Sequence, residues 1–164
     1  MQVSQPEYRV IEVIRLRKDL RPPLPPFAIP AGIALESFDA GRHARAAHLL
    51  LASGYAPGDG AVAAFDDWLA SLLADSEFDA RAFIVARDDS GALVGLIHCW
   101  IVPFVKDLVV APAWRRRGLG EALLRQAFLF FRDRGEAHLD LKVVRNNASG
   151  AERLYRRLGM VAVV

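Results

Sequence analysis

The sequence predicts a single α/β (α+β) domain in which a mixed β-sheet carries α-helices on its faces. Short stretches rich in β-branched and aromatic residues alternate with stretches of helical periodicity through the second half of the chain. The chain has 164 residues, of which 53% are hydrophobic. This length suits one domain of ordinary size with its own hydrophobic core and is too short for two such domains.

The first 30 residues predict a strand followed by a linker. Residues 8–17 are rich in β-branched side chains, which favour a strand. Residues 21–30, RPPLPPFAIP, are too dense in proline for a helix or a central strand, so we expect an extended connector along the surface. The PxxP pattern is also a known ligand of SH3-like domains, but a rigid connector is the simpler interpretation. We therefore divide the chain into residues 1–30 and a main domain, residues 31–164.

The main domain predicts an alternation of strands and helices. We expect strands at 33–36, 83–88, 93–101, 105–110 and 138–143. We expect helices at 40–53, 62–74, 119–134 and 151–158. The DDSG turn at 88–91 predicts a hairpin, and Gly135 and Gly159 are typical residues after a helix end. The last residues, VAVV, are enough for one short strand.

Composition argues against several function classes. The formal net charge is only +2, and the arginines do not form an extended basic face with stacking aromatics, so we expect no nucleic-acid partner. The four histidines and the single Cys99 lack metal-ligand spacing, so we expect no metal site. A hydrolase nucleophile elbow, G-x-S-x-G, is also missing from the sequence.

The expected location is the cytoplasm. No apolar run approaches the roughly 20 residues that a membrane helix needs, so we expect no membrane partner. Charges interrupt the apolar stretch near the N-terminus, unlike the core of a signal peptide. The single cysteine excludes an internal disulfide and suits a reducing compartment.

The stretch DLVVAPAWRRRGLGEALLRQ, residues 107–126, predicts an anion site. A strand ends at Pro112 and a helix starts near Gly118, where the first helical N–H groups lack partners within the helix. These N–H groups and the helix dipole attract a negative charge. Gly118 and Gly120 let a phosphate approach the backbone, and three consecutive arginines at 115–117 add positive charge.

Two common phosphate-binding motifs do not fit this stretch. The nucleotide P-loop requires Lys and then Ser or Thr after its last glycine, but Glu121 and Ala122 follow Gly120. The dinucleotide fingerprint requires a small residue where Leu123 stands. The ligand is therefore neither of these nucleotide types.

The stretch resembles instead the signature of the GNAT superfamily of acyl-CoA-dependent N-acyltransferases. The pattern L-x-V-x-P followed by [R/Q]-x-x-G-x-[G/A] is matched by Leu108, Val110, Pro112, Arg115, Gly118 and Gly120. A second family pattern, N-x-[S/T]-G-A-x-x-L-Y-x-x-x-G-[F/M], is matched about 30 residues later by Asn147, Gly150, Ala151, Leu154, Tyr155 and Gly159. Two matches in the expected order make coincidence improbable.

The resemblance implies a mostly antiparallel sheet flanked by helices and acetyl-CoA as the cosubstrate, in residues 31–164. The loop amides would hold the pyrophosphate, and the preceding strand would pair with the pantetheine arm as another strand does. The implied cofactor-binding residues are Leu108, Val109, Val110, Arg115, Arg116, Arg117, Gly118, Leu119, Gly120, Glu121 and Asn147. Asn147 has an alternative interpretation, as a cap of the helix that follows it.

The resemblance also implies direct attack of an amine on the thioester. The site must accept a proton, stabilise the oxyanion and protonate the sulfur. A backbone N–H near Val109 or Val110 would serve the oxyanion. Tyr155 would be the acid, and its alternative interpretation is a core residue with a satisfied hydroxyl. The base is open: Lys106 stands where several relatives have Glu, which leaves Asp107, His98 or proton loss through ordered water.

The sequence defines the acceptor amine less closely than the cosubstrate. Tyr55 and Asp59 lie in a loop that forms part of the acceptor site in relatives, and the acceptor class is a small-molecule or peptide amine. The alternative to an N-acetyltransferase is a non-catalytic acyl-CoA-binding regulatory domain.

The C-terminus departs from the family pattern. Family domains usually finish with a β-hairpin, for which this chain is one strand short. We hypothesise that residues 8–17 fill the gap, either within the chain or by exchange with a second subunit of a homodimer.

Overall fold

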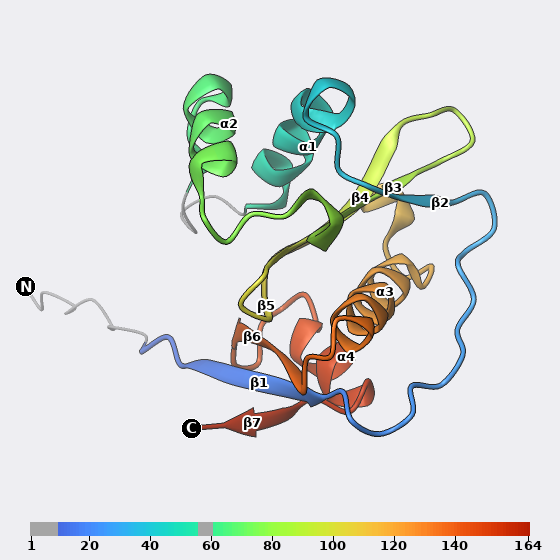
Figure 1. Cartoon of the computed structure of the whole chain (residues 1–164), viewed down its shortest axis with the longest axis vertical. Helices are drawn as coiled ribbons and strands as arrows, with labels where there is room; N and C mark the ends of the chain where they lie inside the picture. Colours follow the sequence, from blue (N-terminus) through green and yellow to red (C-terminus); the bar gives the residue numbers. More distant parts are fainter. Residues whose placement is uncertain (1–9, 56–60) are drawn as a thin grey trace, which may run out of the picture.

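A computed structural model describes residues 10–55 and 61–164 and shows one seven-stranded sheet with helices on both faces (Figure 1). The strands are β1 (Val13–Asp19), β2 (Ala34–Ser37), β3 (Phe83–Arg87), β4 (Leu93–Trp100), β5 (Phe104–Val110), β6 (His138–Val144) and β7 (Val161–Val163). The α-helices are α1 (Ala40–Gly54), α2 (Phe65–Ala74), α3 (Leu119–Asp133) and α4 (Ala151–Arg157). Two short 3₁₀ turns, η1 (Ala80–Ala82) and η2 (Pro112–Trp114), complete the described elements.

The sheet is mixed and mostly antiparallel, which confirms the predicted fold class. Its strand order is β2-β3-β4-β5-β6-β1-β7. Among the described strands, β5 and β6 form the one parallel pair, and every other neighbouring pair is antiparallel. The elements expected for the main domain are all present, with ends shifted by a few residues.

The helix expected at 62–74 begins later, at Phe65. Asp66 and Asp67 then lie in its first turn, where negative side chains favour the exposed N–H groups. Asp59 and the rest of 56–60 lie outside the described residues.

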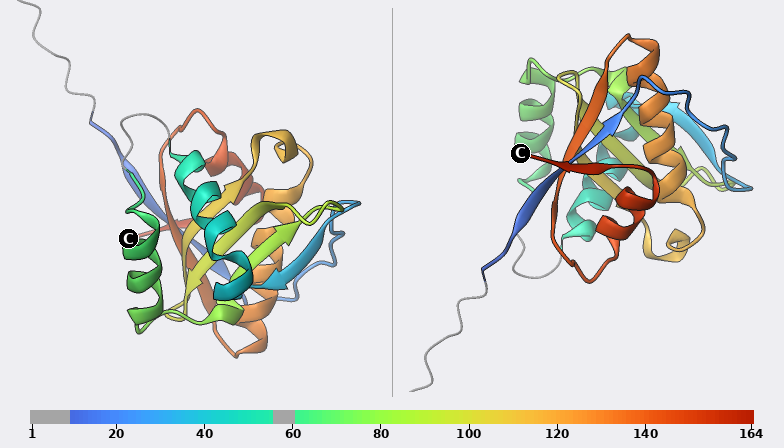
Figure 2. Two further views of the ribbon diagram at one scale, coloured as in Figure 1. Left: turned by 90° about the horizontal axis from the view of Figure 1, so that it is seen from above. Right: turned by 90° about the horizontal axis from the view of Figure 1, so that it is seen from below.

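Two apolar clusters hold the layers together. Phe128 and Phe131 of α3 pack on one face of the sheet, and α4 contributes Tyr155 to the same cluster. Leu51 of α1 and Leu72 of α2 pack on the other face. Figure 2 shows the two helix pairs on opposite sides of the sheet. In the part of the chain that the structure describes, the helices are too short or too polar to cross a bilayer.

β1 lies between β6 and β7 and completes the C-terminal half of the sheet. It pairs antiparallel with β6 from Val13↔Val144 to Asp19↔His138 and antiparallel with β7 from Arg15↔Val163 to Arg17↔Val161. The N-terminal strand therefore occupies the gap within its own chain, as the first form of the hypothesis predicts. It begins later than expected, at Val13, and it ends later because Lys18 and Asp19 continue the ladder with β6.

A buried carboxylate fixes β1 against β6. The Asp140 side chain is fully buried, and its two oxygens accept hydrogen bonds from Nε of Arg15 at 2.7 Å and from Nε of Arg17 at 2.8 Å. Burial alone would raise the pKa of Asp140, but the hydrogen bonds and charges of Arg17 and Arg15 outweigh it and lower the pKa. The carboxylate thus stays ionised in the folded protein.

We expect Leu16→Ala to destabilise the protein strongly. Leu16 is fully buried at the centre of β1, and leucine truncation in a core costs about 2–5 kcal/mol of unfolding free energy. Val13→Ala on the same strand is the control, because Val13 is 55% exposed and its truncation should cost less than about 0.5 kcal/mol. Urea denaturation measures both losses of unfolding free energy. Equally small losses in the two variants would contradict the burial of β1 in the centre of the sheet.

We expect Asp140→Asn to cost about 1–3 kcal/mol at neutral pH, because charged hydrogen bonds are lost while the guanidinium groups keep partial access to water. The pKa of Asp140 is lower in the folded protein than in the unfolded chain. Its contribution to stability is therefore full above the unfolded pKa, about 4, and is lost as the pH falls through the folded pKa. Urea titrations from pH 7 to pH 3 should show that the unfolding free energy falls less steeply with decreasing pH in Asp140→Asn than in wild type. Asp133→Asn, at an exposed position on α3, is the control. The same pH dependence of unfolding free energy in both variants would refute this role of Asp140.

Candidate functional site

The site forms where β5 and β6 separate. Their parallel ladder consists of Phe104↔Asp140 and Val105↔Leu141, and beyond these pairs the two strands diverge (Figure 1). The remaining length of β5 keeps its partner β4 on one side and faces an opening on the other. An opening of this kind leaves backbone hydrogen-bonding groups available to an extended ligand.

Alternation along β5 determines which peptide groups face the opening. The N–H of Ala111 donates to the carbonyl of Val94 at 2.8 Å, so this residue faces the β4 side. Because successive residues of a strand turn to opposite neighbours, Val109 also faces β4, whereas Leu108 and Val110 face the opening. Of the two residues considered for the oxyanion, Val110 has the suitable direction.

The glycine loop presents unpartnered N–H groups at the start of α3. Gly118 has a left-handed backbone with φ of 83° and lacks a side chain that would cap the helix. Arg116 is also left-handed, with φ of 59°. Successive amides in such a loop form a concave anion-binding surface, and the helix dipole adds to it. Ala122 makes the first helical bond, to the carbonyl of Gly118, so the N–H groups of residues 119–121 precede the helical ladder.

The side chains of the loop line its rim. Nε of Arg115 donates to the carbonyl of Val110 at 3.1 Å, and the Arg117 guanidinium lies 3.9 Å from the Trp114 ring centre. Glu121 forms ion pairs with Arg125 at 3.1 Å and Arg157 at 3.4 Å. Arg116 is exposed, and Leu119 is buried in the core. The backbone therefore supplies the anion-binding groups, and the arginines surround them with positive charge.

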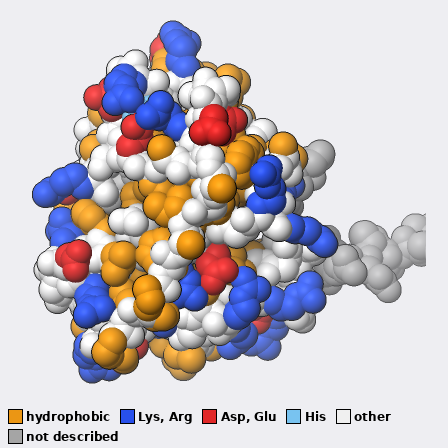
Figure 3. All heavy atoms as spheres, turned by 90° about the vertical axis from the view of Figure 1, so that its right-hand side faces the viewer, with side chains coloured by type: hydrophobic (Ala, Val, Ile, Leu, Met, Phe, Trp, Pro, Cys, Tyr) orange, Lys and Arg blue, Asp and Glu red, His pale blue; other side chains and the backbone are white. Residues whose placement is uncertain are grey.

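The proline-rich segment contributes to this region, which sequence reasoning did not foresee. A hollow of about 370 Å³ lies between residues 26–30 and the first turns of α3, next to Gly118, Arg117 and Arg125. Figure 3 views the molecule from this side, where apolar side chains are bordered by Lys and Arg. The segment crosses over a helix far from it in sequence, so no local pattern could have revealed the hollow.

Asn147 and Tyr155 lie on either side of the start of α4. The Oδ1 atom of Asn147 accepts a hydrogen bond from the N–H of Ala151 at 3.2 Å, so this residue caps α4 as its alternative interpretation predicts. Its side-chain NH₂ group remains a possible donor to a ligand. Tyr155 faces the core and is 9% exposed, and burial raises the pKa of its hydroxyl to about 12.

His98 and Asp107 face each other across β4 and β5. They are register partners, and Nδ1 of His98 lies 3.8 Å from Oδ2 of Asp107. This distance is too long for a hydrogen bond. The His98 ring is stacked on Phe83 with centroids 4.6 Å apart, and its Nε2 is buried without a partner among the described residues.

Asp107 is the more accessible of the two, with a side chain that is 17% exposed. The end of α1 lies close to β5, because a Cβ on Gly54 would come within 3.0 Å of the Val109 side chain. Burial raises the pKa of Tyr55, and the negative charge of Asp107 raises it further. Asp107 therefore lies between a buried histidine and the end of α1. Within residues 10–55 and 61–164, no three potential metal ligands come together.

A family model and several known proteins are similar to this chain. The family model described as Acetyltransferase (GNAT) family matches residues 45–160. A streptothricin acetyltransferase from Streptomyces lavendulae is 46% identical over 86 residues, which are 49% of this chain and 44% of that protein. A mycothiol acetyltransferase from Actinosynnema mirum is 33% identical over 159 residues, which are 92% of this chain and 52% of that protein.

A solved structure is similar over nearly the whole chain. The GCN5-related N-acetyltransferase from Sphaerobacter thermophilus superposes with a TM-score of 0.81 and 27% identity, over 95% of this chain and 50% of that one. The chain thus spans about half the length of the relatives that it matches.

Proposed function

This chain belongs to the acetyltransferase (GNAT) family, and we propose that it transfers an acetyl group from acetyl-CoA to an amine by direct attack on the thioester. The observation that carries the proposal is that two sets of available backbone groups follow each other along the chain. The first is the N–H groups of Leu108 and Val110 on the open side of β5, and the second is the N–H groups at the start of α3. An extended arm that ends in a pyrophosphate fits such an arrangement, because a strand edge and a helix N-terminus follow each other directly.

The cosubstrate would lie across these two sets of groups with its two ends in different places. The loop amides from Arg116 to Glu121 and the surrounding arginines suit the pyrophosphate. The hollow beside Phe27 and Arg125 continues from the loop and suits the nucleotide end. The thioester end would then lie near Leu108 and Asp107.

The reaction requires a group that accepts a proton from the ammonium, a group that stabilises the oxyanion and a group that protonates the thiolate. This chain offers one candidate for each. Asp107 accepts the proton of the attacking ammonium, and His98 behind it stabilises that position. The N–H of Val110 donates to the oxyanion, because it points into the opening. When the carbon–sulfur bond breaks, the Tyr155 hydroxyl gives its proton to the thiolate, and it regains a proton when the acylated nitrogen loses its second one. Burial raises the pKa of this hydroxyl to about 12, so it carries its proton at neutral pH.

A non-catalytic acyl-CoA-binding domain is the second candidate, supported by Lys106 at the position that often holds a catalytic Glu. Incubation with acetyl-CoA and a panel of small-molecule and peptide amines separates the two functions. An acetyltransferase releases CoA in proportion to the amine acetylated. A binding domain retains CoA affinity in calorimetry without any amine-dependent release.

We expect Gly118→Ala to weaken CoA binding at least fivefold. Both Gly118 and Gly91 have left-handed backbones, with φ of 83° and 84°, and an added Cβ would meet nothing within 4 Å at either. Each alanine should therefore cost about 1 kcal/mol of unfolding free energy through backbone strain. Calorimetry with CoA should show the affinity loss in Gly118→Ala and not in Gly91→Ala; an equal effect on both would remove the loop from the binding site.

We expect Tyr155→Phe to reduce kcat on the order of 100-fold while CoA affinity stays within about twofold, because general acid catalysis commonly contributes this much. The phenylalanine keeps the ring in the core cluster and removes only the hydroxyl. Steady-state kinetics and calorimetry on the same samples measure both quantities. Unchanged kcat would exclude Tyr155 as the acid.

A further inference from the structure

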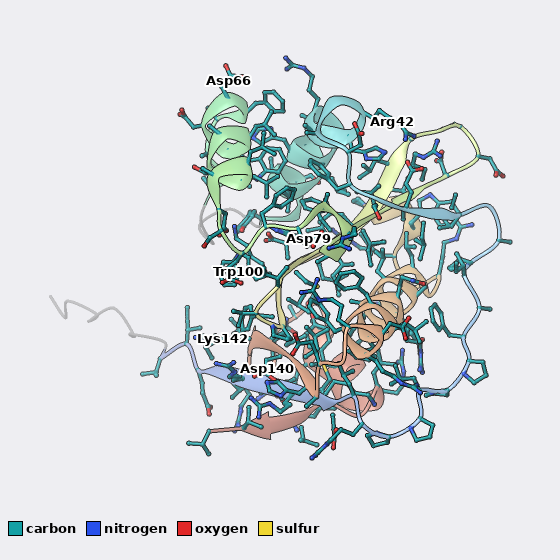
Figure 4. The ribbon with its side chains drawn as sticks, viewed as in Figure 1. Arg42, Asp66, Asp79, Trp100, Asp140 and Lys142 are labelled. Atoms are coloured by element: carbon teal, nitrogen blue, oxygen red, sulfur yellow. The ribbon has the colours of Figure 1, made fainter. Side chains whose placement is uncertain are left out.

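Four cationic side chains gather on the face of β5, β6 and β1 that points away from α3 and α4. They are Arg15, Arg17, Lys106 and Lys142, and we call their surface the cationic face. The core-facing residues of the same strands, such as Leu16 and Leu141, are buried, whereas Lys142 is exposed. Figure 4 shows Lys142 and Asp140 near the β6 end of this face and Trp100 near its β4 end.

Strand register brings these charges together. Arg15 is the partner of Lys142, and Arg17 is the partner of Asp140 two residues further along the ladder. Residues two apart on a strand share a face, so the two arginines and the lysine lie side by side. Their proximity follows from the insertion of β1 beside β6.

Two aromatic rings connect this cluster to Lys106. The Arg15 guanidinium lies 5.6 Å from the ring centre of Phe104, and Trp100 is stacked on Phe104 with centroids 5.6 Å apart. The Lys106 ammonium lies 5.5 Å from the Trp100 ring. The stacked rings of Phe104 and Trp100 thus form a continuous aromatic surface, here called the floor, with a cation at each end.

Positive charge is in excess on this floor. Asp140 contacts both arginines, which remain 42% and 38% exposed. Asp75 accepts a hydrogen bond from the Trp100 indole at 3.1 Å. Among the described residues, neither Lys106 nor Lys142 forms an ion pair. The two carboxylates that contact the floor, Asp140 and Asp75, are thus outnumbered by the four cations, and this excess of positive charge suits an anionic ligand.

The floor adjoins the place where the amine would react. Lys106 directly precedes Asp107, and Phe104 and Asp140 form the first of the two pairs after which β5 and β6 separate. We propose that the cationic face binds a carboxylate or phosphate group of the acceptor, so that the acceptor is an amine that also carries a negative charge. This inference rests on the proposed function and specifies the acceptor class.

A binding measurement tests the face without catalysis. The indole ¹⁵N–¹H signal of Trp100 in the full chain is followed during titration with inorganic phosphate or acetate, with NaCl holding the ionic strength constant. A saturable shift is expected, weakened at least fivefold in Lys142→Glu and in Lys106→Glu. Arg132→Glu, the same charge change at an exposed position on α3, should bind like wild type. The Trp114 signal reports separately on anions at the glycine loop.

The absence of a saturable Trp100 shift, or equal affinity in all variants, would overturn the inference whether or not the protein is an enzyme. The relative response to phosphate and acetate tells which anionic group the face prefers.

Kinetics then connects the face to the acceptor. Acceptors are compared in pairs that differ in the anionic group: glycine with glycinamide, and O-phosphoethanolamine with ethanolamine. The ratio of kcat/KM between charged and uncharged members should fall about tenfold in Lys142→Glu and stay constant in Arg132→Glu. Turnover with an unchanged ratio contradicts the inference alone. No turnover with any amine contradicts the proposed function, and the Trp100 titration still decides the face.

Discussion

The burial of one carboxylate, Asp140, is the constraint on which the rest of the structure depends. Its side chain is fully buried and contacts two arginines of β1, and its N–H donates to the carbonyl of Pro103 at 3.0 Å just before β5. One residue therefore connects three strands at the point where the short parallel ladder begins. A buried charge is costly unless its partners are present, so β1 must be in place for this junction to be stable.

The candidate site follows from what happens beyond that junction. β5 and β6 separate after two residue pairs, and the peptide groups of Leu108 and Val110 are left without a neighbouring strand. Asp107, which precedes Leu108 on the same strand, is the register partner of His98 on β4. The first strand of the chain thereby supports an opening built from residues nearly a hundred positions later, and it carries two arginines to the edge of that opening.

Local patterns in the sequence predicted the parts of this architecture that depend on local chemistry. Gly118, the helix after it and the Asn147–Tyr155 pattern could be recognised because spacing along the chain determines them. The missing C-terminal strand also pointed to the role of the N-terminal one. The pairing of Asp140 with Arg15 and Arg17 could not be read in this way, since those residues are more than 120 positions apart. The same holds for the hollow beside Phe27 and for the alternation that turns Val110, and not Val109, to the opening.

Amide hydrogen exchange with and without CoA tests the central claim most directly. The account predicts that the N–H groups of Leu108 and Val110 exchange rapidly in the free protein, because they lack a strand partner. They should become protected together with the loop amides at residues 116–121 when CoA binds, while the already paired Val109 changes little. CoA binding that leaves Leu108, Val110 and the loop amides unprotected would contradict the account.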